Sequence, residues 1–229
     1  MNTRVILAED HHIVREGLVA LLQREHDIDV VAQARDGMEL VRLAREYDPD
    51  VVLVDVVMPR MNGIEAMRRL RAEPMRCKMI CLSAHAEPHY VSQALDAGAN
   101  GYVLKASAFA ELARGIRRVM DHQLFLSGEL AGDALQGRLP ANKSPSARTQ
   151  GPSFGTATRL TPRERQMVQL LSEGYSAQQI AVQLHLSAKT VATHREHVFT
   201  KLHIQGIAEL TRFALREGIS SLDAARPQA

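Results

Sequence analysis

Short apolar runs alternate with longer segments of helical spacing over residues 4–120, and this alternation restricts the fold more than any other feature. The runs, at residues 5–8, 30–31, 51–54, 79–82 and 102–104, are rich in Val, Ile and Leu and are typical of buried strands. Because a helix-length segment follows each run, the strands are expected to be parallel and covered on both faces. We therefore predict a doubly wound α/β domain with a five-stranded parallel sheet at residues 1–122.

The pattern changes after this domain. Residues 123–157 are enriched in Gly, Pro, Ser, Ala and Thr, a composition typical of a flexible linker. Residues 158–222 are helical throughout, with Thr161, Ser176 and Ser187 as N-cap candidates and Gly174 and Gly218 as helix stops. We predict a small all-α domain of four helices there, and a disordered tail at residues 223–229.

Composition excludes several classes of protein. The chain has 229 residues, of which 45% are hydrophobic and 24% charged, as in soluble globular proteins. It contains no apolar run of membrane-spanning length and does not begin like a signal peptide, so we expect a cytoplasmic protein with no membrane partner. Only Cys77 and Cys81 are present, too few for a disulfide framework or a tetrahedral zinc site.

Charge is distributed unevenly along the chain. Residues 1–120 carry 16 Lys and Arg against 17 Asp and Glu, whereas residues 155–229 carry 9 against 6. The chain has no Trp on which single-stranded bases could stack. The C-terminal domain therefore favours duplex DNA or an acidic partner.

Charged or hydroxyl residues stand at the ends of four apolar runs. Glu9 and Asp10 follow the first run, Asp55 the third, Ser83 the fourth and Lys105 the fifth. Taken singly, an Asp at a strand end is usually a turn-former and a Lys a solvated charge. Because the carboxyl ends of parallel strands meet at one edge of the sheet, the set as a whole predicts one acidic pocket.

Three carboxylates in one pocket repel one another unless a cation neutralises them. A few carboxylates, with water and a phosphate, suit the octahedral shell of Mg²⁺, which is the expected cofactor. Asp55 is the candidate nucleophile, because an aspartate can attack a phosphoryl group to form an acyl phosphate. Lys105 would neutralise charge on the transferring oxygens, and Ser83 would donate a hydrogen bond.

These residues resemble a known family. The motifs are Glu9-Asp10, Asp55 with Met58-Pro59 and Gly63, Ser83-Ala84, and Gly101-Tyr102-Val103-Leu104-Lys105. Over residues 4–120 they are similar to the flavodoxin-like receiver domain of two-component response regulators.

The resemblance implies a role for each position. Asp55 would accept phosphate from a sensor histidine kinase, and Lys105 would pair with the phosphoryl group. Glu9, Asp10, Asp55 and the backbone carbonyl of Val57 would hold Mg²⁺. Ser83 and Tyr102 would act as the switch that converts the new charge into a change of surface.

Two predicted helices at residues 176–184 and 187–202 have the close spacing of a helix-turn-helix. The motifs Leu160-Thr161-Pro162-Arg163-Glu164, Ser187-Ala188-Lys189-Thr190-Val191, Thr193-His194 and Lys201-Leu202 resemble the LuxR-type helix-turn-helix. Behind a receiver, this makes the chain similar to the NarL/FixJ group of response regulators.

The second of these helices would be the recognition helix. The phosphate-contact candidates are Lys189, Thr190, His194, Arg195 and Lys201. Ala192, Thr193 and Glu196 would face the major groove, where Glu196 could accept from cytosine or remain solvated. In the last helix Ile207, Leu210 and Phe213 are dimer candidates, although they could equally form the core of the small domain.

The protein is expected to be a transcriptional regulator and not an enzyme. Phosphorylation of Asp55 would promote its dimerisation and its binding to double-stranded promoter DNA. RNA polymerase would be a further partner.

Three alternatives stay open. A stand-alone phosphohydrolase would need an acid-base partner where Val57 stands. A ligand-sensing LuxR-type receptor would not need the strand-end set, and a protein-binding regulator would fit the modest charge and Glu196.

Overall fold

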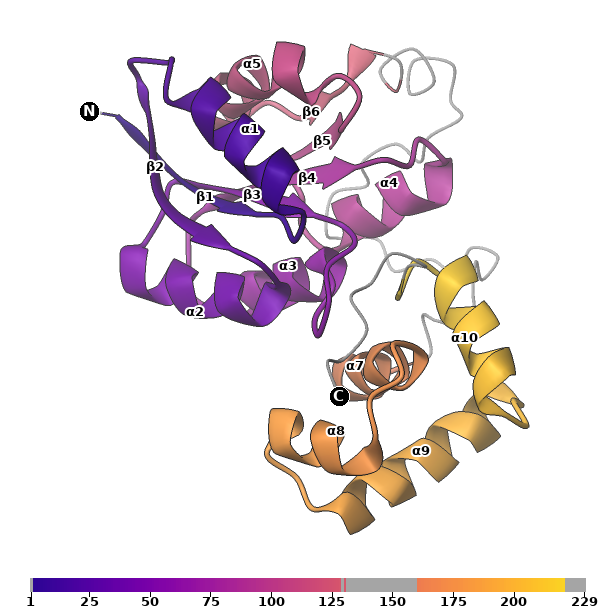
Figure 1. The fold of residues 1–229 in the computed structure, drawn as a ribbon. Coiled ribbons are helices and arrows are strands. Elements are labelled where there is room, and N and C mark those ends of the chain that lie inside the picture. The colour runs from indigo at the N-terminus through magenta and orange to yellow at the C-terminus, as the bar shows by residue number, and fades with distance from the viewer. Residues whose placement is uncertain (1, 129, 131–159, 221–229) are drawn as a thin grey trace. The chain divides into compact units, whose positions relative to one another are not determined.

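A computed structural model describes residues 2–128, 130 and 160–220, and the chain divides into two units at residues 144 and 145. The first unit is a parallel sheet between helices, and the second is all-helical (Figure 1). Most of the predicted linker at 123–157 and all of the predicted tail at 223–229 lie outside the described residues.

The sheet of the first unit has six strands in the order β2-β1-β3-β4-β5-β6, and every neighbouring pair is parallel. The strands are β1 (Thr3–Ala8), β2 (Ile28–Ala34), β3 (Val51–Asp55), β4 (Lys78–Ser83), β5 (Gly101–Leu104) and β6 (Phe125–Leu126). The helices between them are α1 (His12–Leu22), α2 (Gly37–Tyr47), α3 (Gly63–Ala72), α4 (Pro88–Asp96) and α5 (Ala108–Met120). The predicted α/β class is confirmed.

Side chains that alternate along each strand supply two cores, one on each face. On β1, Val5 and Leu7 pack with α1 and α5, whereas Ile6 and Ala8 pack with α2, α3 and α4. Figure 1 shows α1 and α5 on one side of the sheet and α2 and α3 on the other. All five residues of β3 are buried, as expected for a central strand covered on both faces.

The prediction of five strands is wrong, because β6 adds a sixth beside β5. Phe125 is buried, and a Cβ atom on Gly115 of α5 would lie 2.9 Å from its ring. Because Gly115 has no side chain, α5 leaves room for the Phe125 ring beside β5. Two residues are too few to show a strand period, and they fall in the range that composition assigned to the linker.

The described part of the second unit contains the four predicted helices: α7 (Pro162–Ser172), α8 (Ala177–Leu184), α9 (Ala188–Leu202) and α10 (Ile207–Arg216). Thr161 and Ser176 form capping boxes, and the Ser187 side chain accepts a hydrogen bond from the backbone N–H of Thr190. Gly174 follows α7 with a φ of 89°, in the left-handed region that glycine adopts readily. Each helix contributes to one core, which includes Met167, Ile180, Val191, Val198 and Leu210.

Among the described residues, no helix is both long and apolar enough to cross a lipid bilayer.

Candidate phosphoacceptor pocket and DNA-binding helix

Four neighbouring strands carry the pocket residues to one edge of the sheet. Asp55 is the last residue of β3 and Ser83 the last of β4, while Glu9 and Lys105 each directly follow a strand. Strands β1, β3, β4 and β5 lie side by side in that order. Because these four strands are parallel neighbours, their carboxyl ends bring the four side chains to the same edge of the sheet, as predicted.

Lys105 joins the two buried carboxylates. Its Nζ atom lies 2.7 Å from Glu9 Oε2 and donates to Asp55 Oδ2 at 2.9 Å. The backbone N–H of Val57 donates to the other Asp55 oxygen at 3.3 Å. Asp55 is 3% exposed and Glu9 is completely buried. The lysine therefore bridges the nucleophile candidate and its neighbouring acid.

One lysine does not neutralise this pocket. Burial, and after it the charge of Glu9, raise the pKa of Asp55 to about 7 against the opposing effect of Lys105. Burial also raises the pKa of Asp10. A raised carboxyl pKa means that the protein environment disfavours the charged form. A cation in the pocket would remove this disadvantage.

The donor atoms for such a cation are already close together. One ligand atom from each of Glu9, Asp10, Asp55 and His11 lies within 4.8 Å of the other three. Carboxylate oxygens are the ligands that Mg²⁺ prefers. The residues therefore fit a small divalent cation. The sequence prediction did not include His11, although its position directly after the acidic pair could have suggested it.

Ser83 and Tyr102 share a partner in His85. The Ser83 Oγ accepts a hydrogen bond from the backbone N–H of His85 at 3.0 Å, and the Tyr102 hydroxyl donates to the His85 carbonyl at 2.8 Å. The His85 ring stacks on Tyr90 with a centroid separation of 4.4 Å. Tyr102 is completely buried, and burial raises the pKa of its hydroxyl. The two predicted switch residues are thus connected through one loop residue.

Gly63 allows the loop after Asp55 to close. Its backbone N–H donates to the Val56 carbonyl at 2.9 Å, and a Cβ atom at this position would lie only 2.0 Å from the Asp55 carbonyl oxygen. The Asn62 side chain then caps α3 by accepting from the backbone N–H of Glu65 at 2.8 Å. Any side chain at Gly63 would displace the backbone that carries the nucleophile candidate.

In the second unit α9 has one buried face and one exposed face. Val191, Val198 and Leu202 are buried, as predicted. Five of the eight DNA-contact candidates are exposed: Lys189, Ala192, Thr193, Arg195 and Glu196. The other three are partly exposed: Thr190, His194 and Lys201.

Two candidate cations on α9 have contacts of their own. The Arg195 guanidinium lies over the Phe199 ring at 5.2 Å from its centroid. Lys201 Nζ is 2.7 Å from Glu164 Oε2, which links the end of α9 to the capping box of α7. Lys189 makes no comparable contact among the described residues.

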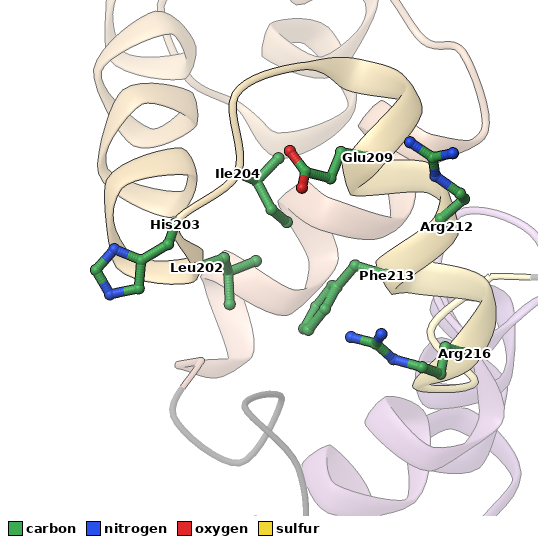
Figure 2. Close-up of a pocket in the computed structure, with 7 residues that line it drawn as sticks. All are labelled: Leu202, His203, Ile204, Glu209, Arg212, Phe213 and Arg216. Carbon is green, nitrogen blue, oxygen red and sulfur yellow. The ribbon is translucent and has the colours of Figure 1, made fainter.

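The dimer candidates on α10 differ in burial. Ile207 is 48% exposed, whereas Leu210 and Phe213 belong to the core of the helical unit. Phe213 also forms part of the wall of a cavity of about 330 Å³ between the end of α9 and α10 (Figure 2). The apolar character of Leu210 and Phe213 is therefore explained by the core.

Comparison with known proteins identifies both units. Residues 5–117 match the response regulator receiver domain, and residues 158–214 match the bacterial regulatory proteins of the luxR family. The transcriptional regulatory protein LiaR of Bacillus subtilis is 37% identical over 213 residues, which cover 93% of this chain and 97% of LiaR. This chain is a response regulator. It has a receiver domain followed by a LuxR-type DNA-binding domain.

Two further relatives agree with this assignment. The response regulator UvrY of Escherichia coli K12 is 33% identical over 96% of each chain. A crystal structure of a LuxR-family two-component response regulator from Aurantimonas sp. SI85-9A1 has 36% identity and a TM-score of 0.58, and it covers 60% of this chain and 99% of that one. The predicted class, a response regulator of the NarL/FixJ type that regulates transcription, is confirmed.

Proposed function

We propose that this response regulator is switched by phosphorylation of Asp55 and binds double-stranded promoter DNA through α9. The observation that carries the proposal is the position of Asp55 at the end of β3, buried and bonded to Lys105 beside Glu9. This geometry supports the proposal, because the candidate nucleophile, a lysine and oxygens that could hold a metal ion lie in a single pocket.

The proposed reaction forms an acyl phosphate on Asp55. A carboxylate oxygen attacks the phosphorus of a phosphohistidine on a sensor kinase, the P–N bond breaks, and its electron pair leaves with the imidazole. Lys105 pairs with the phosphoryl oxygens, since its Nζ atom already contacts the attacking carboxylate. Ser83 then gives up the hydrogen bond that it accepts from the His85 N–H and donates its own hydroxyl to a phosphoryl oxygen, which loosens the loop that holds the Tyr102 hydroxyl.

Mg²⁺ is the proposed cofactor. Glu9, Asp10, Asp55 and the backbone carbonyl of Val57 would hold it, and its charge would stabilise the negative oxygens of the transferring group. The raised pKa values of Asp10 and Asp55 support this assignment, because both carboxylates gain from a neighbouring positive charge.

The proposed DNA interface is the exposed face of α9. Lys189, Thr190, His194 and Arg195 would contact phosphates, and Ala192, Thr193 and Glu196 would face base edges. Lys201 would reach a phosphate only by sharing or leaving its contact with Glu164. On α10, Ile207 is the dimer candidate that is exposed to a partner.

We further propose that the protein is cytoplasmic, and that its partners are a sensor histidine kinase, a second copy of itself and RNA polymerase.

The domain division proposed from the sequence is retained with one change. Strand β6 supports an extension of the phosphoacceptor domain from residue 122 to Ser127, whose backbone N–H donates to the Tyr102 carbonyl at 3.0 Å.

The test combines phosphorylation, molecular mass and DNA binding in one preparation. Wild type and Asp55→Ala would be incubated with acetyl phosphate and Mg²⁺, and each would be measured by phosphate-affinity electrophoresis, sizing with light scattering and gel shift. The duplex would be one that the protein selects from a random pool. Phosphorylation, dimerisation and tighter binding in the wild type alone are expected. Equal binding in every state would show that Asp55 is not the control point.

A further inference from the structure

His11 places a nitrogen ligand among the carboxylates of the pocket. Its Nδ1 atom lies 2.9 Å from Asp10 Oδ1 and 3.1 Å from Glu9 Oε1. The side chain is 53% exposed, so one edge of the ring faces solvent while the Nδ1 edge faces the acids. A hydrogen bond to Glu9 and an ion pair with Asp10 thus hold Nδ1 beside the carboxylate oxygens, where a bound metal ion would replace the Nδ1 proton.

The turn that carries His11 is held by hydrogen bonds. The backbone N–H of His11 donates to Glu9 Oε1 at 3.2 Å, and the buried Arg15 guanidinium donates to the Glu9 carbonyl at 2.8 Å. His11 itself is the N-cap of α1, with an extended backbone. The backbone hydrogen bonds of the turn and the contacts of the ring therefore both hold the Nδ1 atom in place.

The spacing of the four ligand atoms suits one small ion. Zinc-type metals bind nitrogen and oxygen at about 2.0–2.2 Å, so ligands around one ion lie roughly 3–4.4 Å apart. The corresponding atoms of Glu9, Asp10, His11 and Asp55 lie within 4.8 Å of one another. Small side-chain adjustments would bring all four into one coordination shell.

A nitrogen ligand changes which metals the pocket favours. Mg²⁺ prefers an all-oxygen shell, whereas imidazole is a good ligand for first-row transition metals. We propose that His11 Nδ1 is a metal ligand, and that it raises the affinity of this pocket for first-row transition-metal dications relative to Mg²⁺. This inference rests on the divalent-cation site of the proposed function, and it adds a residue and a preference to that site.

The matched control is His12. It is the next residue, it is exposed, and it is not part of the ligand cluster. His11→Ala and His12→Ala each remove one imidazole from the same turn. A general effect of charge or helix start would affect both variants, whereas metal ligation would affect only the first.

The experiment is a titration of full-length wild type, His11→Ala and His12→Ala with Mg²⁺, Mn²⁺ and Co²⁺ by calorimetry. We expect His11→Ala to lose roughly 10-fold or more in affinity for Co²⁺ and less for Mn²⁺, with Mg²⁺ affinity unchanged. His12→Ala should match the wild type. Pulsed electron paramagnetic resonance of bound Mn²⁺ should detect coupling to a ligand nitrogen in the wild type and in His12→Ala, and none in His11→Ala.

The outcomes separate this inference from the proposed function. Equal Co²⁺ and Mn²⁺ affinities in wild type and His11→Ala, with no nitrogen coupling to Mn²⁺, would overturn the role of His11. If Mg²⁺ still supported phosphorylation of Asp55 in that case, the proposed function would stand. If the titrations detected no dication binding to the wild type, and Asp55→Asn gave the same titration curves, the cation site itself would be refuted.

Discussion

In the acidic pocket Glu9 and Asp55 are buried and Lys105 is held between them, whereas on the outer face of α9 Lys189 and Glu196 stand in solvent. The pocket residues come from separate strands and depend on the whole sheet for their positions. The α9 residues depend on one capped helix and its buried face. Substitutions in the pocket should therefore change stability and function together, while substitutions on α9 should separate them.

The largest expected effect comes from Gly63→Ala. The added Cβ atom would meet the Asp55 carbonyl oxygen, a backbone atom that cannot move without shifting β3. We expect the receiver domain to lose at least about 3 kcal/mol of unfolding free energy, at the upper end of overpacking effects. Thermal unfolding and acetyl phosphate labelling of the full chain would both show the loss. Gly206→Ala in the helical unit is the control, because no atom beyond its chain neighbours lies within 4 Å of the added Cβ; as the N-cap of α10 it should cost no more than about 1 kcal/mol. Equal stability of Gly63→Ala and wild type would contradict the packing.

Asp55→Asn should abolish phosphorylation and yet stabilise the receiver at high pH. The raised pKa means that the folded protein disfavours the Asp55 carboxylate, and this penalty is present in full above about pH 7. The penalty disappears as the pH falls below about 4, where the carboxyl becomes protonated in both the folded and the unfolded state.

The unfolding temperature of Asp55→Asn should therefore exceed that of wild type at about pH 8 without added metal, and the gain should vanish below about pH 4. Mg²⁺ should raise the unfolding temperature of wild type much more than that of the variant. A lower unfolding temperature for Asp55→Asn at high pH would mean that the contact with Lys105 outweighs the burial of charge.

Lys189→Ala should weaken DNA binding without changing stability. Lys189 is exposed on α9, so its loss should remove the proposed phosphate contact and reduce the salt slope of binding by about 1. Val191→Ala, two residues along and buried, should instead cost about 2 kcal/mol of unfolding free energy. Fluorescence anisotropy at several salt concentrations and thermal unfolding would test the pair. Unchanged affinity and salt slope in Lys189→Ala would remove this residue from the interface.

The smallest expected effect on stability comes from a surface ion pair of the receiver, formed by the exposed side chains of Arg117 and Asp27. Arg117 contacts both oxygens of Asp27, at 2.7 and 2.8 Å, and lowers the pKa of this carboxyl to about 2. The pair should stabilise the fold above the ordinary carboxyl pKa, and its contribution should be lost as the pH falls from about 4 to about 2. The difference in unfolding temperature between wild type and Asp27→Asn should shrink over that range. A constant difference would show that the pair does not act through its charge.

The sequence predicts the parts of the fold that have a local signal, such as an apolar run or a helix cap. Strands β1, β3, β4 and β5 are continuous apolar runs, and the capped helices α7, α8 and α9 begin where Thr161, Ser176 and Ser187 indicate. The strand-end acids, serine and lysine follow from the same pattern, because parallel topology determines where they meet.

The remaining features depend on contacts between distant residues. Strand β6 packs the Phe125 ring against Gly115, and Lys201 contacts Glu164 across the helical unit. The orientation of His11 depends on hydrogen bonds within the folded turn. None of these contacts leaves a periodic signal in the sequence, so sequence reasoning could name the residues without pairing them.

Strand β6 also bears on how chimeric regulators should be built from this chain. Phe125 and Leu126 pair with β5, and the Ser127 side chain accepts a hydrogen bond from the backbone N–H of Leu104, next to Lys105. A fusion joined at residue 122 would discard a buried aromatic ring and make β5 an edge strand. A fusion joined after Ser127 would carry the complete sheet, so that a foreign output domain could be exchanged without disturbing the lysine that contacts Asp55.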